Sequence, residues 1–195
     1  MNSVTNILYW ISTGLLIPVI ALLLFGFVRA LMLLGSFFGM YIGRIKQEKK
    51  QQELLERLEE GNLDSVKIKG NKMFTEHLQR IIKANGRSIV TEKILADFEI
   101  ASEKELSSSK SLAKLGPMIG LMGTLIPMGP ALVGLAQGDI VSMAQNMQVA
   151  FSTTVIGLFA GAIGYVTQLV KQRWFVADIN NLEYITNLLK DKNHA

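Results

Sequence analysis

Apolar residues in this chain are concentrated in three long blocks separated by polar, charged segments. The blocks are residues 7–42, 115–136 and 149–170. A helix needs about 20 apolar residues to cross the hydrocarbon core of a bilayer, and each block is at least that long. A soluble domain of this size rarely gathers its apolar residues in this way. The pattern therefore predicts an all-α membrane protein with three transmembrane helices.

The first block is longer than one span requires. At about 1.5 Å per residue, residues 7–42 would form a helix of about 54 Å, well beyond the thickness of a bilayer core. Two short spans are disfavoured, because Arg29 would lie at the reversal. We predict that residues 1–43 hold an interfacial segment followed by one span over residues 14–38. Arg29 would then lie in the inner half of the span, where it snorkels, faces a protein partner or contacts a lipid headgroup.

The polar segments favour long helices outside the bilayer. Within residues 44–113, one helix is predicted to end at Gly61-Asn62, a second to cover residues 71–84, and a third to begin near Ser88. The third is expected to continue into the second span (residues 114–136). The tail, residues 171–195, would extend the third span as a helix.

Apolar residues recur at helical spacing in these polar segments, a pattern typical of core or oligomer contacts. They are Met73, Phe74, Leu78, Ile81 and Ile82 in the second helix, Ile89, Ile94, Leu95, Phe98 and Ala101 in the third, and Val176, Ile179, Leu182, Ile185 and Leu189 in the tail. His77 is expected on the surface of its helix.

Positive charge is distributed very unevenly along the chain. Of the 20 Lys and Arg residues, 18 lie in residues 44–110 or from residue 171 onward, and the other two are Arg29 and Lys114. Cytoplasmic flanks of membrane helices carry an excess of Lys and Arg. The chain is therefore predicted to cross its membrane three times, with its N-terminus and the 137–148 connector outside and its C-terminus inside.

The spans contain few groups that could do chemistry. Between Glu105 and Asp178 the only acidic residue is Asp139, and the second and third spans contain no carboxylate, histidine or cysteine. An intramembrane protease would need a Ser–His or paired-Asp arrangement at membrane depth, whereas His77 and His194 lie in cytoplasmic segments. We therefore expect no enzyme activity, no catalytic residue, no metal site, no cofactor and no nucleic-acid partner.

Small residues form a stripe on each of these two spans. The stripe on the second span comprises Gly116, Gly120, Gly123, Pro127, Pro130 and Gly134, with Thr124 beside it; the stripe on the third comprises Thr154, Gly157, Gly161, Gly164 and Gln168, with Thr153 and Ala160 at its edge. Small residues let membrane helices approach closely, and intramembrane threonines often bond to their own helix backbone. These facts alone leave two alternatives, a non-conducting scaffold and a pore lining.

Two motifs favour the pore lining. Residues 116–124 (GPMIGLMGT) resemble the Pro-x-x-Gly-Leu-x-Gly-Thr signature of the MotA/TolQ/ExbB proton-channel family, and residues 151–158 (FSTTVIGL) resemble the start of that family's last span. The resemblance covers about residues 111–175. The chain departs from the better-known members at Pro127 and Pro130, and the larger cytoplasmic elements with which the flagellar branch contacts its rotor cannot be placed in this sequence.

The resemblance implies a multi-pass protein of the cytoplasmic (inner) membrane. It also implies a cyclic homo-oligomer, a pentamer, around two copies of a single-span partner similar to ExbD, TolR or MotB. An aspartate within the partner's span would carry the ion, and Thr124 and Thr154, with Thr153 next to them, would form the ion pathway. Ion-motive force would then drive mechanical work through the partner. The glycine stripes are expected to close the ring. The sequence leaves open whether the ion is a proton or sodium and which process is powered.

Overall fold

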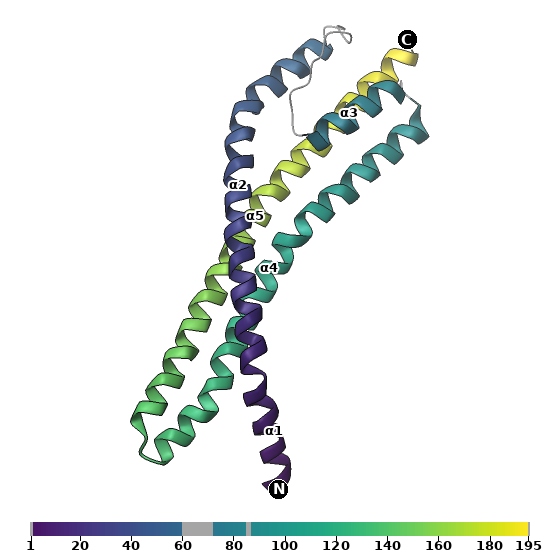
Figure 1. Ribbon diagram of the computed structural model, residues 1–195. Helices are drawn as coiled ribbons and strands as arrows, with labels where there is room; N and C mark the ends of the chain where they lie inside the picture. The colour runs from purple at the N-terminus through teal and green to yellow at the C-terminus, as the bar shows by residue number, and fades with distance from the viewer. Residues whose placement is uncertain (1, 60–71, 85–86, 195) are drawn as a thin grey trace. The chain divides into compact units, whose positions relative to one another are not determined.

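The computed structural model describes residues 2–59, 72–84 and 87–194, and within these ranges all regular structure is helical. The elements are α1 (Asn2–Gly14), α2 (Leu16–Glu59), α3 (Lys72–Ala84), α4 (Ser88–Ala136) and α5 (Ile140–His194) (Figure 1). The predicted continuity of the helix that begins near Ser88 with the second span, and of the tail with the third span, is confirmed. The expected helix end at Gly61-Asn62 lies outside the described residues.

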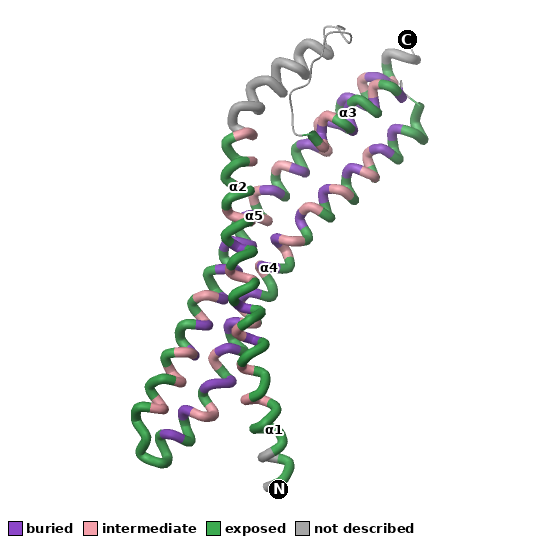
Figure 2. Tube along the Cα trace, viewed as in Figure 1, coloured by how far each residue is buried: buried purple, intermediate pink, exposed green. Residues whose placement is uncertain are grey.

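Three helical stretches have the length and composition to cross a membrane. They are Ile7–Arg44, Ser88–Ala136 and Ile140–Asp191. Many large apolar side chains on them are exposed in the isolated chain, for example Phe25 at 65%, Leu121 at 59% and Val155 at 66%, and exposed positions run along their whole length (Figure 2). Such surfaces would drive aggregation in water but are well solvated by lipid tails.

The first apolar block forms one span, not two. α1 ends at Gly14, and the Leu15 N–H donates to the carbonyl oxygens of both Ile11 and Ser12 at 3.1 Å. The break occurs here because Pro18 has no N–H to donate to the Gly14 carbonyl. α2 then continues past Arg29 without interruption, which excludes a reversal at that residue.

The α4–α5 connector is shorter than the 137–148 segment expected, because α5 already begins at Ile140. Gly138 adopts a positive φ of 74°, and the Asp139 N–H donates to the Gly134 carbonyl at 2.9 Å. This pattern ends a helix through a left-handed glycine. The Asp139 carboxylate then accepts from the Ser142 N–H at 3.0 Å and caps α5. The aspartate is therefore a helix cap.

The chain divides into two compact units: Met1–Gly35 with Ser108–Gln168, and Ser36–Ser107 with Leu169–Ala195. In the first unit, α2 packs on α4 and α5 through Ala30, which is fully buried against Leu112, Ala160 and Ile163. Phe27 lies 6.2 Å from Phe159 between ring centroids. This contact places α2 along one side of the α4–α5 pair.

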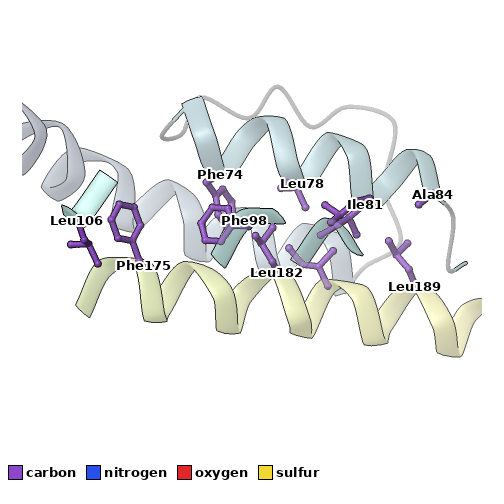
Figure 3. Close-up of a cluster of buried hydrophobic side chains, with 11 residues drawn as sticks. Phe74, Leu78, Ile81, Ala84, Phe98, Leu106, Phe175, Leu182 and Leu189 are labelled. Carbon is purple, nitrogen blue, oxygen red and sulfur yellow. The ribbon is translucent and has the colours of Figure 1, made fainter. Parts of the chain in front are cut away.

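The second unit has its own hydrophobic core, built by α3, the first part of α4 and the last part of α5 (Figure 3). Its buried members are Phe74, Leu78, Ile81, Ala84, Ile94, Phe98, Leu106, Phe175, Leu182, Ile185 and Leu189. Most of the positions predicted from helical spacing therefore do form a core. A core of this kind explains why α3 is stable although its segment is short and polar.

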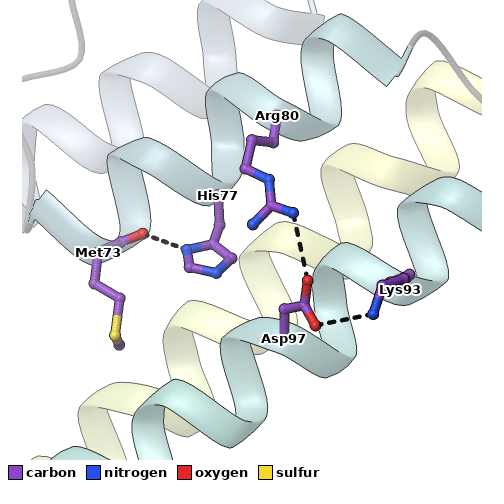
Figure 4. Close-up of polar contacts among 5 residues, drawn as sticks. All are labelled: Met73, His77, Arg80, Lys93 and Asp97. Atoms are coloured by element: carbon purple, nitrogen blue, oxygen red, sulfur yellow. Dashed lines mark hydrogen bonds and ion pairs between the residues drawn. The ribbon is translucent and has the colours of Figure 1, made fainter.

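Several positions in this unit differ from the sequence expectations. Ile89 and Val176 are exposed at 84% and 58%, whereas Phe175, not predicted, is buried. His77 was expected on the surface but is buried, and its Nδ1 lies 2.8 Å from the Met73 carbonyl oxygen (Figure 4). Its ring is edge-on to that of Phe98, with 5.2 Å between the ring centroids. A histidine bonded to its own backbone can join an apolar face, which explains the misplacement.

Candidate ion pathway along the α4–α5 helix pair

The two glycine stripes face each other within one chain and form a close helix–helix contact, here called the seam. A Cβ atom added at Gly116 would lie 2.8 Å from the Gly157 carbonyl oxygen, and one added at Gly157 would lie 2.6 Å from the Gly120 Cα. At Gly161, an added Cβ would lie 2.6 Å from the Pro117 ring. Only hydrogen fits at these positions, so the backbones of α4 and α5 are in direct contact.

The seam continues toward both ends of the spans. A Cβ atom added at Gly164 would lie 2.6 Å from the Ala113 nitrogen, and one added at Gly134 would lie 3.2 Å from the Asp139 carbonyl oxygen. The stripes were expected to close the ring between subunits. In the structure the two stripes pack against each other within one chain. Contacts between copies of the chain would therefore have to use other faces of these helices.

Thr153 lies inside the seam. Its side chain is buried, at 5% exposure, and fills the space that Gly123 leaves open: an added Cβ there would lie 2.6 Å from the Thr153 Oγ1. The hydroxyl donates to the carbonyl oxygens of Val149 at 3.0 Å and Ala150 at 2.9 Å. Thr153 is thus placed as a packing residue of the helix pair.

Thr124 and Thr154 lie at the edge of the seam and are half-buried. The Thr124 hydroxyl donates to the Leu121 carbonyl at 2.7 Å, and the Thr154 hydroxyl donates to the Ala150 carbonyl at 3.1 Å. In this single chain both threonines therefore bond to their own helices. Each retains acceptor capacity on its oxygen, because a hydroxyl has two lone pairs.

Helix geometry places these two threonines on the same side of the seam. Thr124 follows Gly123, and Thr154 follows Thr153, so each lies about 100° around its helix from a seam residue. α4 and α5 run antiparallel through their short turn (Figure 1), and in antiparallel helices equal steps along the chain turn toward the same side. We call this surface the threonine face.

α2 does not cover the threonine face. The residues that hold Ala30 of α2 are Leu112, Ala160 and Ile163, which lie on the other side of the seam by the same helical geometry. Leu121 and Leu158, which border the threonines, are exposed at 59% and 55%. The threonine face is therefore open to a neighbouring helix.

Prolines interrupt the backbone bonding of α4 next to this face. Pro127 is fully buried and Pro130 half-buried, and α4 remains helical through both. Pro127 has no N–H for the Gly123 carbonyl, and Pro130 has none for the Ile126 carbonyl. Membrane helices tolerate such carbonyls where they face protein or water. The carbonyl of Gly123 is adjacent in sequence to Thr124.

The MotA/TolQ/ExbB proton channel family model matches residues 66–183, more than half of the chain. The chain belongs to this family. No curated protein and no solved structure matched it. Family membership and three apolar helices together make it a multi-pass membrane protein of a proton-channel family, as the two sequence motifs indicated.

Sequence reasoning missed how the charged residues that bracket the apolar region are paired. The Lys171 Nζ lies 3.1 Å from the Glu105 Oε1, and the Lys171 side chain is only 6% exposed. The Arg44 Nη1 donates to the Asp178 carboxylate at 2.9 Å, in a pair whose side chains are 10% and 0% exposed. Glu105 and Asp178 are the last acidic residue before the two spans and the first after them. This signal could have singled out the two carboxylates, but not their basic partners.

The Arg44–Asp178 pair lies beside a group of aromatic rings that joins α2 to α5. Phe37 stacks on Trp174 with an interplanar angle of 10° and a centroid distance of 6.0 Å. The Arg44 guanidinium carbon lies 6.0 Å from the Trp174 ring centroid, within cation–π range. These contacts form a clamp between the two helices within the second unit.

Proposed function

We propose that this chain is the ion-channel subunit of an inner-membrane motor that converts ion-motive force into mechanical work through a single-span partner. Five copies would surround two partner helices, each carrying a membrane-embedded aspartate. The threonine face would point toward those helices. N-out and C-in orientation would place the α4–α5 turn at the ion entrance and the second unit in the cytoplasm. No covalent catalysis is part of this proposal.

The observation that carries the proposal is the threonine face itself. Two hydroxyls from different helices lie on one open side of a tightly packed pair, in spans that hold no carboxylate or histidine. Such a surface can hydrogen-bond a partner's carboxyl group but cannot compete with it for the proton. The polar and titrating functions would therefore be divided between two proteins.

The hydroxyls can respond to the charge of the partner. When the partner's carboxyl group is protonated, its O–H can donate to a threonine oxygen while the threonine keeps its bond to Leu121 or Ala150. When the group is ionised, the hydroxyl must rotate to donate to it. Neutralising a charge at bilayer depth also removes a desolvation penalty of several kcal/mol, enough to shift the partner helix from one subunit to the next.

A non-conducting scaffold is the second candidate. It is supported by the finding that Thr124, Thr153 and Thr154 all donate to their own helix backbones in the isolated chain. The close packing of the seam also accounts for its glycines without a pore. The two candidates differ in what the hydroxyls of Thr124 and Thr154 do when the partner is present.

Replacing the two threonines with valine separates the candidates. Thr124→Val and Thr154→Val nearly conserve shape but remove the hydroxyl, and losing a hydrogen bond to a charged group costs about 1.5–3 kcal/mol. We therefore expect proton or sodium flux, in vesicles that contain the chain with its co-encoded partner, to fall roughly tenfold to a hundredfold, because about 1.4 kcal/mol corresponds to a factor of ten. The serine variants should retain part of the flux.

Thr153→Val is the matched control, since that hydroxyl faces the seam. Native mass spectrometry of each variant shows whether the oligomer is intact and counts its subunits. Equal flux in the wild type and in both valine variants, with oligomers of normal size, would leave the scaffold as the better account. A stable monomer in the wild type would contradict the channel directly.

A further inference from the structure

The second unit contains a groove between the end of α3 and the beginning of α4. It has a volume of about 460 Å³ and is lined by Arg80, Lys83, Ala84, Arg87, Ile89, Val90, Lys93 and Ile94. Residues of both helices line the groove. The groove does not involve the threonine face or the seam.

Positive charge surrounds this groove. Four of its eight lining residues are basic and none of the eight is acidic. Asp97, next to the groove, accepts from Arg80 on α3 and from Lys93 on α4, each at 3.4 Å (Figure 4). Because this one carboxylate is shared by two cations, the rim keeps a net positive charge.

The floor of the groove is apolar, and its open side exposes apolar residues. Ala84 and Ile94 are buried at 8% and 4%, whereas Ile89 and Val90 are exposed at 84% and 43%. Ile89 and Val90 thus form a small exposed apolar surface beside the basic residues of the groove. A ligand of this surface therefore needs acidic groups to pair with the basic residues and an apolar group to cover the floor.

We propose that this groove binds an acidic amphipathic peptide segment of another protein. An apolar side chain of the segment would cover Ile89 and Val90, while its carboxylates would pair with Lys83, Arg87 and the other basic residues of the rim. An inorganic phosphate could pair with the basic residues but would leave Ile89 and Val90 uncovered, so it suits the site less well. Binding at this surface is independent of the channel function proposed above, since α3 and the start of α4 form the groove alone.

The test uses the full-length chain in detergent and a short fluorescein-labelled peptide with leucines four residues apart and glutamates between them. A second peptide carries glutamine in place of glutamate. We expect the acidic peptide to bind with salt-sensitive affinity, measured by fluorescence anisotropy, and the glutamine peptide to bind at least tenfold more weakly. Lys83→Glu combined with Arg87→Glu should weaken binding of the acidic peptide about tenfold or more, because it reverses two rim charges.

Ile89→Gln tests the apolar requirement and should also weaken binding. Lys104→Glu is the control, because Lys104 is an exposed lysine on α4 outside the groove. Equal loss of binding in the control and in the double variant would show a nonspecific charge effect and overturn the proposal. Equal binding of the two peptides would also overturn the proposal. The same holds if the wild type binds phosphatidylglycerol vesicles through these residues but binds neither peptide.

Discussion

Replacing Gly157 with alanine should destabilise the α4–α5 pair, because its backbone lies against another backbone. The added Cβ would lie 2.6 Å from the Gly120 Cα and 2.7 Å from the Gly116 carbonyl oxygen. Neither atom belongs to a flexible side chain that could move aside. Ordinary contact begins at 3.4 Å, so the helices must separate by roughly 0.8 Å, the difference between 3.4 Å and 2.6 Å.

The loss of stability can be estimated from the contacts that such a separation weakens. A radial gap of about 0.5–1 Å forfeits a quarter to a half of each dispersion contact along the seam, and overpacking in a close-packed interior typically costs about 1–3 kcal/mol. Alanine also favours the helix over glycine by up to about 1 kcal/mol. The control must therefore contain the same chemical change without the contact.

Gly129→Ala provides that control. Gly129 lies in α4, and a Cβ atom added there meets nothing within 4 Å. The difference between the two variants isolates the steric term, because both gain the same helix propensity. We expect Gly157→Ala to unfold more easily than Gly129→Ala by about 1–3 kcal/mol. The assay is equilibrium unfolding in mixed micelles with increasing SDS, followed by far-UV circular dichroism.

Equal stability of Gly157→Ala and Gly129→Ala would refute the direct backbone contact between the two stripes. A second result would be equally damaging: normal stability of the isolated chain with loss of the oligomer only. That outcome would return the stripes to the subunit interface expected from the sequence.

Two further predictions concern the ends of the spans. Asp178→Leu should destabilise the chain by about 3–5 kcal/mol in the same unfolding assay, because it leaves the Arg44 guanidinium buried without its partner. The Arg44→Leu/Asp178→Leu double variant should recover much of that loss. Equal stability of the single and double variants would show that the pair is not coupled. Single cysteines at positions 2, 139 and 187 test the orientation, because this chain has no cysteine of its own. A membrane-impermeant maleimide should label Asn2→Cys and Asp139→Cys in intact cells and spare Asn187→Cys. Labelling at position 187 would contradict the predicted orientation.

The candidate site could be predicted only in part from the sequence. The stripes containing Gly120 and Gly157, and the threonines beside them, follow from a helical period of 3.6 residues and from the two motifs. Which surface each stripe contacts does not follow, because a glycine stripe suits a neighbouring subunit as well as a neighbouring helix of the same chain. The structure decides this by bringing Gly116, Gly120 and Gly157 into backbone contact.

The sequence by itself determined the parts of this protein that depend on local composition and period. Long apolar runs predict the spans, and Pro18 and Gly138 end helices for reasons that involve only a few neighbouring residues. Burial in the second unit was predicted less completely: Leu78, Phe98 and Leu182 follow the period, but Ile89 shares that period and remains exposed.

Only the tertiary structure decided the contacts between residues far apart in the chain. Lys171 and Glu105 are 66 residues apart, and Arg44 and Asp178 are 134 apart; no local pattern selects those partners among the other charged residues. The same holds for the common side on which Thr124 and Thr154 lie, since it depends on α4 and α5 packing antiparallel through their glycines. Periodicity specifies which residues share one face of a helix, and tertiary packing specifies what that face contacts.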